Sequence, residues 1–257
     1  MPKFAKPVTE PNLKLQPSGR AGELGCWIAS KLAMTNPWLD IAVDDYVLHM
    51  SSPDVGQSQV LKRLFGEILR EVRPRSVLVL GCSTGNGFEH IDPAATSRVV
   101  GVDINPQYLQ RLVERIRSPG FSLDLQCTDL SQYAFEPAAF DLVHAALVFE
   151  YVEWSRLLPR IADTLRFDGV LSVVLQTPSP VSPAVTPTRF TSLGALESIF
   201  RFVDPDVLIE EAAACGLSLE WRRSEQLNAG KAFGVLAFRK VPSKSPPHPT
   251  RGAETNS

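Results

Sequence analysis

An apolar run that leads straight into a glycine-rich turn constrains the fold of this chain more than any other feature. Residues 77–80 read V-L-V-L, and the turn that follows carries glycines at positions 81, 85 and 87. An apolar run without alternation is typical of a strand that is buried on both faces, as in a parallel sheet. Glycines after such a strand let the backbone approach a ligand at the edge where open α/β sheets bind their ligands. The sequence therefore predicts a ligand-binding α/β domain.

A second apolar strand indicates the kind of ligand. Residues 98–103 end in Asp103, sixteen residues after Gly87. A carboxylate at this point is suited to accept hydrogen bonds from the two hydroxyls of a ribose. Asp103 could instead cap the helix expected from Pro106, because Asp is a favoured N-cap, and the two roles can coexist. We expect Asp103 to bind the ribose of a nucleoside.

The spacing of the glycines separates the nucleotide ligands from one another. Dinucleotide-binding loops read G-x-G-x-x-G, and phosphate-binding P-loops end in G-K-S or G-K-T. Here the glycines read G-x-x-x-G-x-G, and Phe88 follows the last of them. This spacing disfavours an NAD(P)-dependent oxidoreductase, which stays an alternative.

The loop resembles the first motif of the class I S-adenosylmethionine (SAM)-dependent methyltransferases. Residues 77–85 read V-L-V-L-G-C-S-T-G, and the common form in the family is V-L-D-L-G-C-G-T-G. Ser83 stands where the family usually has glycine, and Val79 stands where it usually has an acid that organises the methionine end of SAM. The missing acid keeps a second alternative open, a non-catalytic binding protein with the same fold.

The resemblance continues along the chain and implies most of the cofactor contacts. It places Asp129 near the adenine amino group and Leu130 on the adenine ring. Residues 140–147 would run toward the methyl donor, and residues 165–171 resemble the L-K-P-G-G-x-L turn before the fifth strand. The expected cofactor is SAM, no metal is expected, and the expected cofactor-binding residues are Gly81, Cys82, Ser83, Gly85, Gly87, Asp103, Ile104, Asp129, Leu130, Ala146, Tyr46 and His49.

A segment before the glycine loop supplies the last two of these residues. Tyr46, His49 and Met50 are spaced to share one face of a helix, which could face a cofactor carboxylate or pack into the core. A general base is needed only if the methyl acceptor loses a proton, so the catalytic residues stay unknown. The candidates for this base are His49, His144 and Tyr151, although a mid-strand histidine such as His144 is more typical of a hydrogen-bonded core residue.

Strands and helices alternate after residue 75, which predicts a parallel sheet with helices on both faces. The family resemblance implies a doubly wound, mostly parallel, seven-stranded Rossmann-like sheet with an N-terminal helical cap and an antiparallel last strand. Strands are expected at 76–80, 98–103, 121–126, 140–146, 169–176, 217–223 and 232–239. Helices are expected at 21–34, 40–50, 56–72, 86–92, 106–117, 153–166 and 204–215.

The domain organisation follows from composition along the chain. We expect a flexible tail at 1–20, a SAM-binding domain at 21–240 and a disordered tail at 241–257, since both ends are rich in proline and poor in apolar residues. Within the domain, residues 21–56 form the N-terminal cap and residues 177–203 form a proline-rich insert. Specificity for the acceptor should lie in the cap and the insert, because function varies in loops over a constant scaffold.

The net charge and the cysteine content indicate which partners, metal sites and cellular compartment to expect. A net charge of −2 with no basic excess argues against nucleic acid and against a membrane surface. Four cysteines without a C-x-x-C pair argue against a zinc site or a disulfide framework and fit a reducing, cytoplasmic compartment.

Asn36-Pro37-Trp38 resembles the N-P-P-aromatic motif of nucleic-acid nitrogen methylation, but it lacks the second proline, so we assign it no role. The expected function is methyl transfer from SAM to a small molecule, in an undetermined oligomeric state.

Overall fold

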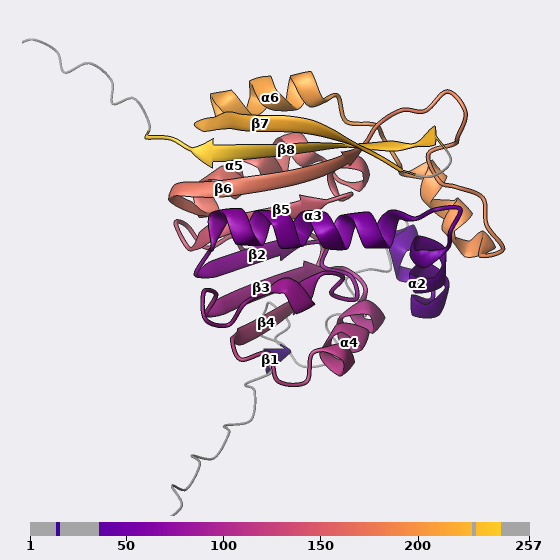
Figure 1. Cartoon of the computed structure of the whole chain (residues 1–257), viewed down its shortest axis with the longest axis horizontal. Coiled ribbons are helices and arrows are strands. Elements are labelled where there is room, and N and C mark those ends of the chain that lie inside the picture. Colours follow the sequence, from indigo (N-terminus) through magenta and orange to yellow (C-terminus); the bar gives the residue numbers. More distant parts are fainter. Residues whose placement is uncertain (1–13, 16–35, 228–229, 243–257) are drawn as a thin grey trace, which may run out of the picture.

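A mostly parallel sheet lies between two layers of helices (Figure 1). The computed structural model describes residues 14–15, 36–227 and 230–242. The strands lie in the order β1-β4-β3-β2-β5-β6-β8-β7, and among these described strands β8 alone runs in the direction opposite to the others. Their bounds are β1 (Lys14–Leu15), β2 (Ser76–Leu80), β3 (Arg98–Asp103), β4 (Ser122–Cys127), β5 (Phe140–Ala146), β6 (Leu165–Gln176), β7 (Leu217–Gln226) and β8 (Ala232–Lys240).

The seven expected strands are all present, so the doubly wound sheet with an antiparallel last strand is confirmed. One further strand, β1, pairs with the outer edge of β4, with Lys14 opposite Asp124. These two residues belong to the segment predicted as a flexible tail. The remainder of that tail, the predicted helix at 21–34 and residues 243–257 lie outside the described residues.

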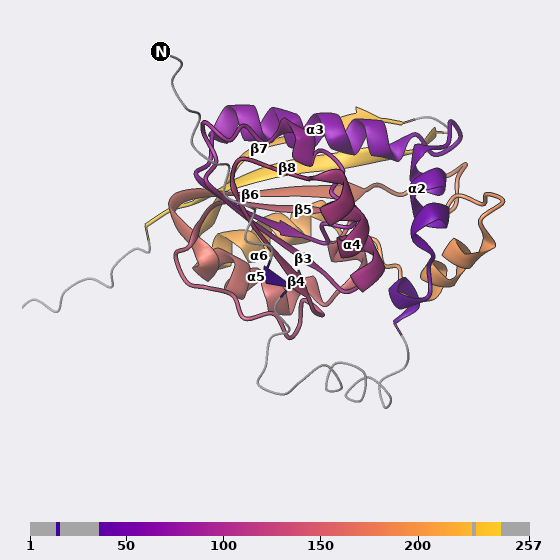
Figure 2. The ribbon, with the colours of Figure 1, turned by 90° about the horizontal axis from the view of Figure 1, so that it is seen from below.

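Four helices cover the two faces of the sheet (Figure 2). Apolar side chains of α3 (Gln57–Val72) and α4 (Pro106–Arg115) pack on one face, and those of α5 (Trp154–Thr164) and α6 (Pro205–Ala214) pack on the other. Strand β2 shows why its sequence does not alternate. Val77 and Val79 point toward α3, while Leu78 and Leu80 point toward α5. Burying each of these side chains stabilises the fold by about 1.5–3 kcal/mol.

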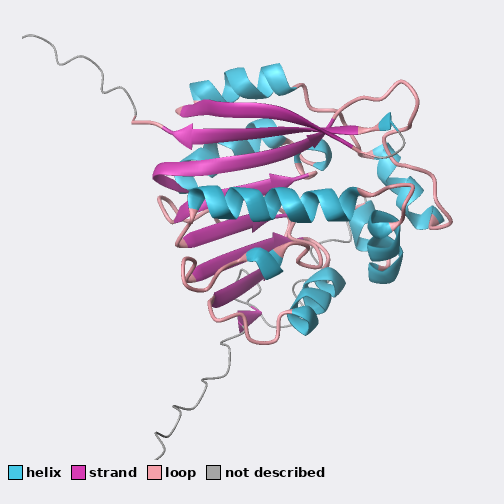
Figure 3. Cartoon of the chain, in the orientation of Figure 1, coloured by secondary structure: helices cyan, strands magenta, loops and turns pink. Residues whose placement is uncertain are grey.

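The remaining elements form a cap at the end of the sheet where the parallel strands terminate (Figure 3). They are α2 (Val43–Ser51) and the short 3-10 helices η1 (Pro37–Leu39), η3 (Phe149–Tyr151) and η4 (Thr191–Ser198). Contacts join α2 to α3, α4 and η4. The predicted insert at 177–203 therefore sits beside the predicted N-terminal cap.

Helix boundaries follow local chemistry with one exception. Asp204 caps α6 by accepting a hydrogen bond from the backbone of Asp206, and Gly216 after the helix has φ +76°, as expected from the sequence. The predicted helix at 86–92 is wrong. Gly85 and Gly87 have φ +74° and +88°, which interrupt a helix, and only the 3-10 turn η2 (Phe88–His90) forms.

Candidate active site

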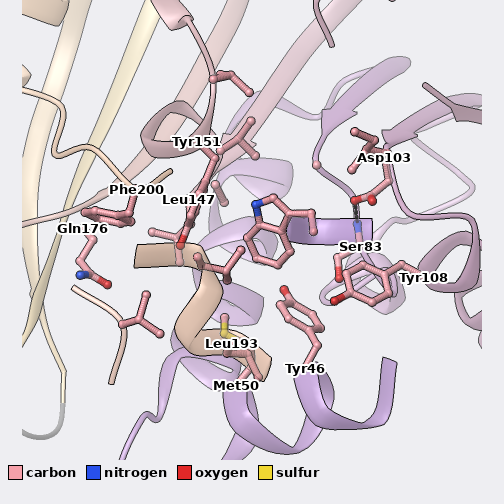
Figure 4. A pocket seen from close by; sticks show the side chains of 18 of the residues that line it. Tyr46, Met50, Ser83, Asp103, Tyr108, Leu147, Tyr151, Gln176, Leu193 and Phe200 are labelled. Atoms are coloured by element: carbon pink, nitrogen blue, oxygen red, sulfur yellow. Dashed lines mark hydrogen bonds between the residues drawn. The ribbon is translucent and has the colours of Figure 1, made fainter. Parts of the chain in front are cut away.

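A pocket lies at the carboxyl ends of the parallel strands, beneath the cap (Figure 4). Each of five neighbouring strands contributes a residue from its end or from the turn after it. These residues are Thr128 after β4, Asp103 from β3, Gly81 after β2, Ala146 from β5 and Gln176 from β6. The sheet thus presents its strand ends to the pocket, as open α/β sheets do to their ligands.

Asp103 is held in place at one end of this pocket. One carboxylate oxygen accepts a hydrogen bond from the Ser83 backbone N–H at 2.8 Å, and the other accepts from the Asn105 backbone N–H at 2.9 Å. Burial raises the pKa of Asp103 to about 6, and these backbone hydrogen bonds oppose the rise. The helix that follows is capped by Asn105, whose side chain accepts from Gln107, so Asp103 is not the N-cap.

Two buried hydroxyls lie beside Asp103. Ser83 has φ +47°, which lies in the left-handed region that favours glycine. It occupies the sequence position where the family usually has glycine. Neither Ser83 Oγ nor Tyr108 Oη has a well-aligned hydrogen-bond partner among the described residues. The Tyr46 ring stacks on the Tyr108 ring with centroids 5.0 Å apart, and both rings lie beside Ser83 (Figure 4), whose side chain interacts with the Tyr46 hydroxyl. Unpartnered buried polar atoms are costly, so these groups fit a polar ligand. We call Gly81, Ser83, Asp103 and Tyr108 the cofactor end.

Three further expected cofactor residues line the same part of the pocket: Ile104, Asp129 and Leu130. Asp129 also accepts a hydrogen bond from the Ser131 backbone at 2.8 Å, so it stabilises the turn in which it lies. Asp129 therefore has a structural role in its turn and also borders the pocket.

Of the five expected cofactor residues in the glycine loop, two border the pocket and three do not. Gly81 and Ser83 line the pocket, whereas Cys82, Gly85 and Gly87 do not. A Cβ atom on Gly85 would lie 2.8 Å from Leu112 Cγ, so this glycine allows α4 to pack against the loop. The Cys82 side chain turns into the core, where burial raises the pKa of its thiol well above the ordinary value. These three residues do not line the pocket, so their expected contacts with the ligand stay a prediction.

The shared face of α2 is confirmed, since Tyr46, His49 and Met50 all line the pocket. The structure nevertheless separates the first two. Tyr46 belongs beside the cofactor end, while His49 Nδ1 lies 3.0 Å from Thr188 Oγ1 of the insert. Burial, with a smaller contribution from the positive charge of Lys231, lowers the pKa of His49.

Of the other two candidates for a general base, one lines the pocket and the other lies in the core. Tyr151 lines the pocket, and burial raises its pKa. His144 does not line it. The His144 ring stacks on Phe65 with centroids 4.6 Å apart, its Nδ1 lies 3.1 Å from Ser172 Oγ, and burial lowers its pKa to about 4. His144 as a base is therefore wrong, because it is a hydrogen-bonded core histidine.

Comparison with known proteins agrees with the geometry of the site. Residues 77–169, which run from β2 into β6, match the family model described as a methyltransferase domain. This part of the chain is similar to a methyltransferase domain. A curated relative, the carboxy-S-adenosyl-L-methionine synthase of a Nitratiruptor species, is 32% identical over 104 residues, which cover 38% of this chain. The chain spans only 43% of the length of that relative.

Solved structures share the fold of this chain. The 1,6-didemethyltoxoflavin-N1-methyltransferase of Burkholderia thailandensis, with bound 1,6-didemethyltoxoflavin and S-adenosylhomocysteine, superposes with a TM-score of 0.55 at 18% identity. The match covers 82% of this chain and 92% of that chain. The 4+2 cyclase SpnF superposes with a TM-score of 0.56 at 14% identity, over 71% of this chain and 82% of that one. The fold is that of the class I SAM-dependent methyltransferases.

The sequence analysis missed several of the residues that line the pocket. Asn36 and Trp38 both line the pocket, and the centroid of the Trp38 ring lies 5.0 Å from that of the Tyr151 ring. The position of Asn36 and Trp38 just before the cap helix was the signal in the sequence that could have placed them at the pocket. Other missed lining residues come from distant segments with no recognisable pattern: Gln57, Leu61, Thr128, Gln176, Thr186, Leu193, Phe200 and Lys231.

Two further observations concern only the described residues. No helix there is both long enough and apolar enough to cross a bilayer. Within the same residues, no three His, Cys, Asp or Glu side chains are grouped so that they could hold a metal ion.

Proposed function

We propose that this protein is a methyltransferase that transfers the methyl group of SAM to a small molecule. The observation that carries the proposal is the cofactor end, where Asp103 is fixed beside two buried hydroxyls that lack well-aligned partners. This end lies at β2, where the chain order of the strands reverses between β3 and β5. Such reversal points are where open α/β sheets bind nucleotides.

The contacts support one orientation of the cofactor. Asp103 would accept hydrogen bonds from the ribose, with the adenine toward Asp129 and Leu130 and the methionine part over Gly81. Val79 packs in the core on the α3 side, so β2 supplies no acid for the ammonium group. Tyr46 borders this region from the cap and is the residue we assign to the methionine end.

Bound SAM supplies an electrophilic methyl group, and an acceptor lone pair forms the new bond to carbon as the sulfonium becomes a thioether. The protein aligns the acceptor and excludes water. Trp38, Leu193 and Phe200 enclose the pocket from the cap and insert. His49 is the better-placed proton acceptor, because it lines the pocket and its lowered pKa keeps it neutral at pH 7.

Titration of the purified protein with three ligands tests the proposal. We expect S-adenosylhomocysteine and SAM to bind in calorimetry and NAD to give no heat of binding. Asp103→Asn should weaken both, whereas Asp163→Asn, an exposed carboxylate on α5, should weaken neither. Methyl transfer is then measured with SAM tritiated in its methyl group and fractionated small molecules from cell extract. SAM binding with no labelled product from any fraction would support the non-catalytic alternative, and NAD binding would support the oxidoreductase.

The proposal includes a reducing, cytoplasmic setting. The three cysteines that the structure describes, Cys82, Cys127 and Cys215, form no disulfide with one another. Alkylation of freshly lysed cells with a mass-tagged maleimide, under denaturing conditions, should label these residues, whereas protection that is released by a reductant would argue for an oxidising compartment.

A further inference from the structure

The end of the pocket opposite Asp103 contains a buried lysine. Lys231 is 2% exposed and lines the pocket. Its Nζ donates a hydrogen bond to the backbone carbonyl of Ala184 at 2.9 Å. In the described residues no Asp or Glu forms an ion pair with it. A positive charge therefore borders the pocket with only a neutral partner.

The side chains that form hydrogen bonds near Lys231 are neutral amides, and behind them the buried Glu150 carboxyl, whose pKa burial raises to about 7, accepts from the Gln176 backbone N–H at 2.7 Å. Gln176 Nε2 donates to the same Ala184 carbonyl at 2.8 Å, and Gln57 Nε2 donates to Gln176 Oε1 at 3.3 Å. His49 contributes a third polar group from the cap. We call Lys231, Gln176, Gln57 and His49 the polar end of the pocket.

This arrangement is unfavourable without a ligand. A buried ammonium with no counter-charge carries a large desolvation cost, and a single carbonyl offsets only part of it. Burial lowers the pKa of Lys231 to about 8, so most of the side chain is still charged at pH 7. An anion in the pocket would supply the missing counter-charge.

The sheet topology places the polar end on the acceptor side. Gln176 ends β6 and Lys231 precedes β8, while Asp103 ends β3, and β2, β5 and β6 separate β3 from β8. Four inter-strand spacings amount to about 19 Å. Figure 4 likewise shows Gln176 and Phe200 across the pocket from Asp103, Ser83 and Tyr108. A cofactor whose ribose lies at Asp103 would present its methyl group toward the middle of this distance.

The walls between the two ends are apolar and aromatic. Trp38 packs edge-on against Tyr151 at 5.0 Å between centroids, Tyr151 packs edge-on against Phe200 at 5.4 Å, and Leu193 lines the same region. We propose that the methyl acceptor is a carboxylate with an aromatic or apolar body, and that Lys231 binds its carboxylate. This inference rests on the proposed function of the same pocket.

Phenylacetate and phenylacetamide are matched probes, since they differ in charge and scarcely in shape. With the protein saturated by S-adenosylhomocysteine, we expect phenylacetate to bind at least about tenfold more tightly than the amide in ligand-observed NMR. Lys231→Met should reduce phenylacetate binding to the level of the amide. Lys240→Met is the control, because Lys240 lies at the other end of β8 and donates to the Leu165 carbonyl at 2.8 Å.

Several results would overturn the inference. They are equal binding of the two probes, no phenylacetate binding at millimolar concentration, unchanged binding in Lys231→Met, or displacement of S-adenosylhomocysteine by phenylacetate. Binding of S-adenosylhomocysteine is measured in the same samples. If that ligand does not bind, the proposed function fails, whereas if it binds and the probe results are negative, only the inference fails.

A melting experiment separates ligand binding from a structural role of Lys231. If the lysine serves a ligand, Lys231→Met should melt at the same or a higher temperature than the wild type at pH 7, because an uncompensated buried charge is removed. A variant that melts lower, or that does not fold, would show that the hydrogen bond to Ala184 holds the structure and would overturn the inference.

Discussion

Asp103→Asn tests the cofactor end most directly, because the structure assigns two separate roles to the carboxylate. It accepts hydrogen bonds from the backbone N–H groups of Ser83 and Asn105 at 2.8 and 2.9 Å, and it borders the pocket. An asparagine keeps one acceptor oxygen and turns an NH2 group toward the other backbone N–H. One buried donor is then unpaired, which costs about 1–3 kcal/mol of folding stability. Asp103→Asn should therefore lower the melting temperature as well as the affinity for the cofactor.

The effect on binding is of similar size but can be measured separately. Hydrogen bonds from ribose to a carboxylate contribute about 1.5–3 kcal/mol, so S-adenosylhomocysteine should bind the variant roughly tenfold to a hundredfold more weakly. The wild type should also bind more weakly at pH 5 than at pH 7.5, since protonation below the pKa of about 6 removes the charge of Asp103. Asp103→Asn should lack this pH dependence.

A deoxyribose analogue of S-adenosylhomocysteine completes the assay. Removing a ribose hydroxyl should weaken binding to the wild type in calorimetry and have little effect on the variant, because the partner of the hydroxyl is already altered. The stability loss affects both ligands equally and cancels in this comparison. If wild type and variant lose the same affinity with the deoxy ligand, Asp103 does not contact the ribose and the reasoning is refuted.

Two further variants test the glycine loop and the buried carboxyl of Glu150. Gly85→Ala should lower the free energy of unfolding by about 1–3 kcal/mol, because φ is +74° and the new Cβ would lie 2.8 Å from Leu112. Its affinity for S-adenosylhomocysteine should stay within about threefold of the wild type. Weaker binding at an unchanged melting temperature would contradict this. Burial raises the pKa of Glu150 from 4.5 to about 7, so the folded protein holds a proton that the unfolded chain releases, and stability should fall as pH rises through this interval. Glu150→Gln should flatten the fall in thermal melts between pH 4.5 and 7, and parallel profiles would show that Glu150 does not cause it.

The sequence predicted the scaffold because the signals for it are local. A buried strand such as β2 is apolar along its whole length, and helix ends carry their caps beside them, as Asp204 does for α6. The order of strands and helices then allows few parallel topologies. Asp103 could be placed for the same reason, since the residue that ends a parallel strand must lie at the edge where ligands bind.

The helix expected at 86–92 failed on the local backbone of Gly85 and Gly87, whereas the other failures come from contact between segments far apart in the chain. Nothing near Gly85 indicates that it serves packing against Leu112, because that neighbour belongs to another helix. Lys231 lies in the pocket only because β8 pairs antiparallel with β6, which brings its first residues beside Gln176. The same register, and not the local sequence, sets the distance between the polar end and the cofactor end.

The position of α2 makes the two halves of the pocket energetically dependent on one another. Tyr46 faces the cofactor end and His49 faces the insert, and they lie three residues apart, about one helical turn. Asp44 pairs with Arg111 of α4 at 2.8 Å, and Asp45 accepts a hydrogen bond from Ser192 of η4, so the helix joins both neighbours. If a ligand at one end of the pocket immobilises α2, a ligand at the other end no longer has to order the helix and binds more tightly. By linkage, the second ligand strengthens binding of the first by the same factor.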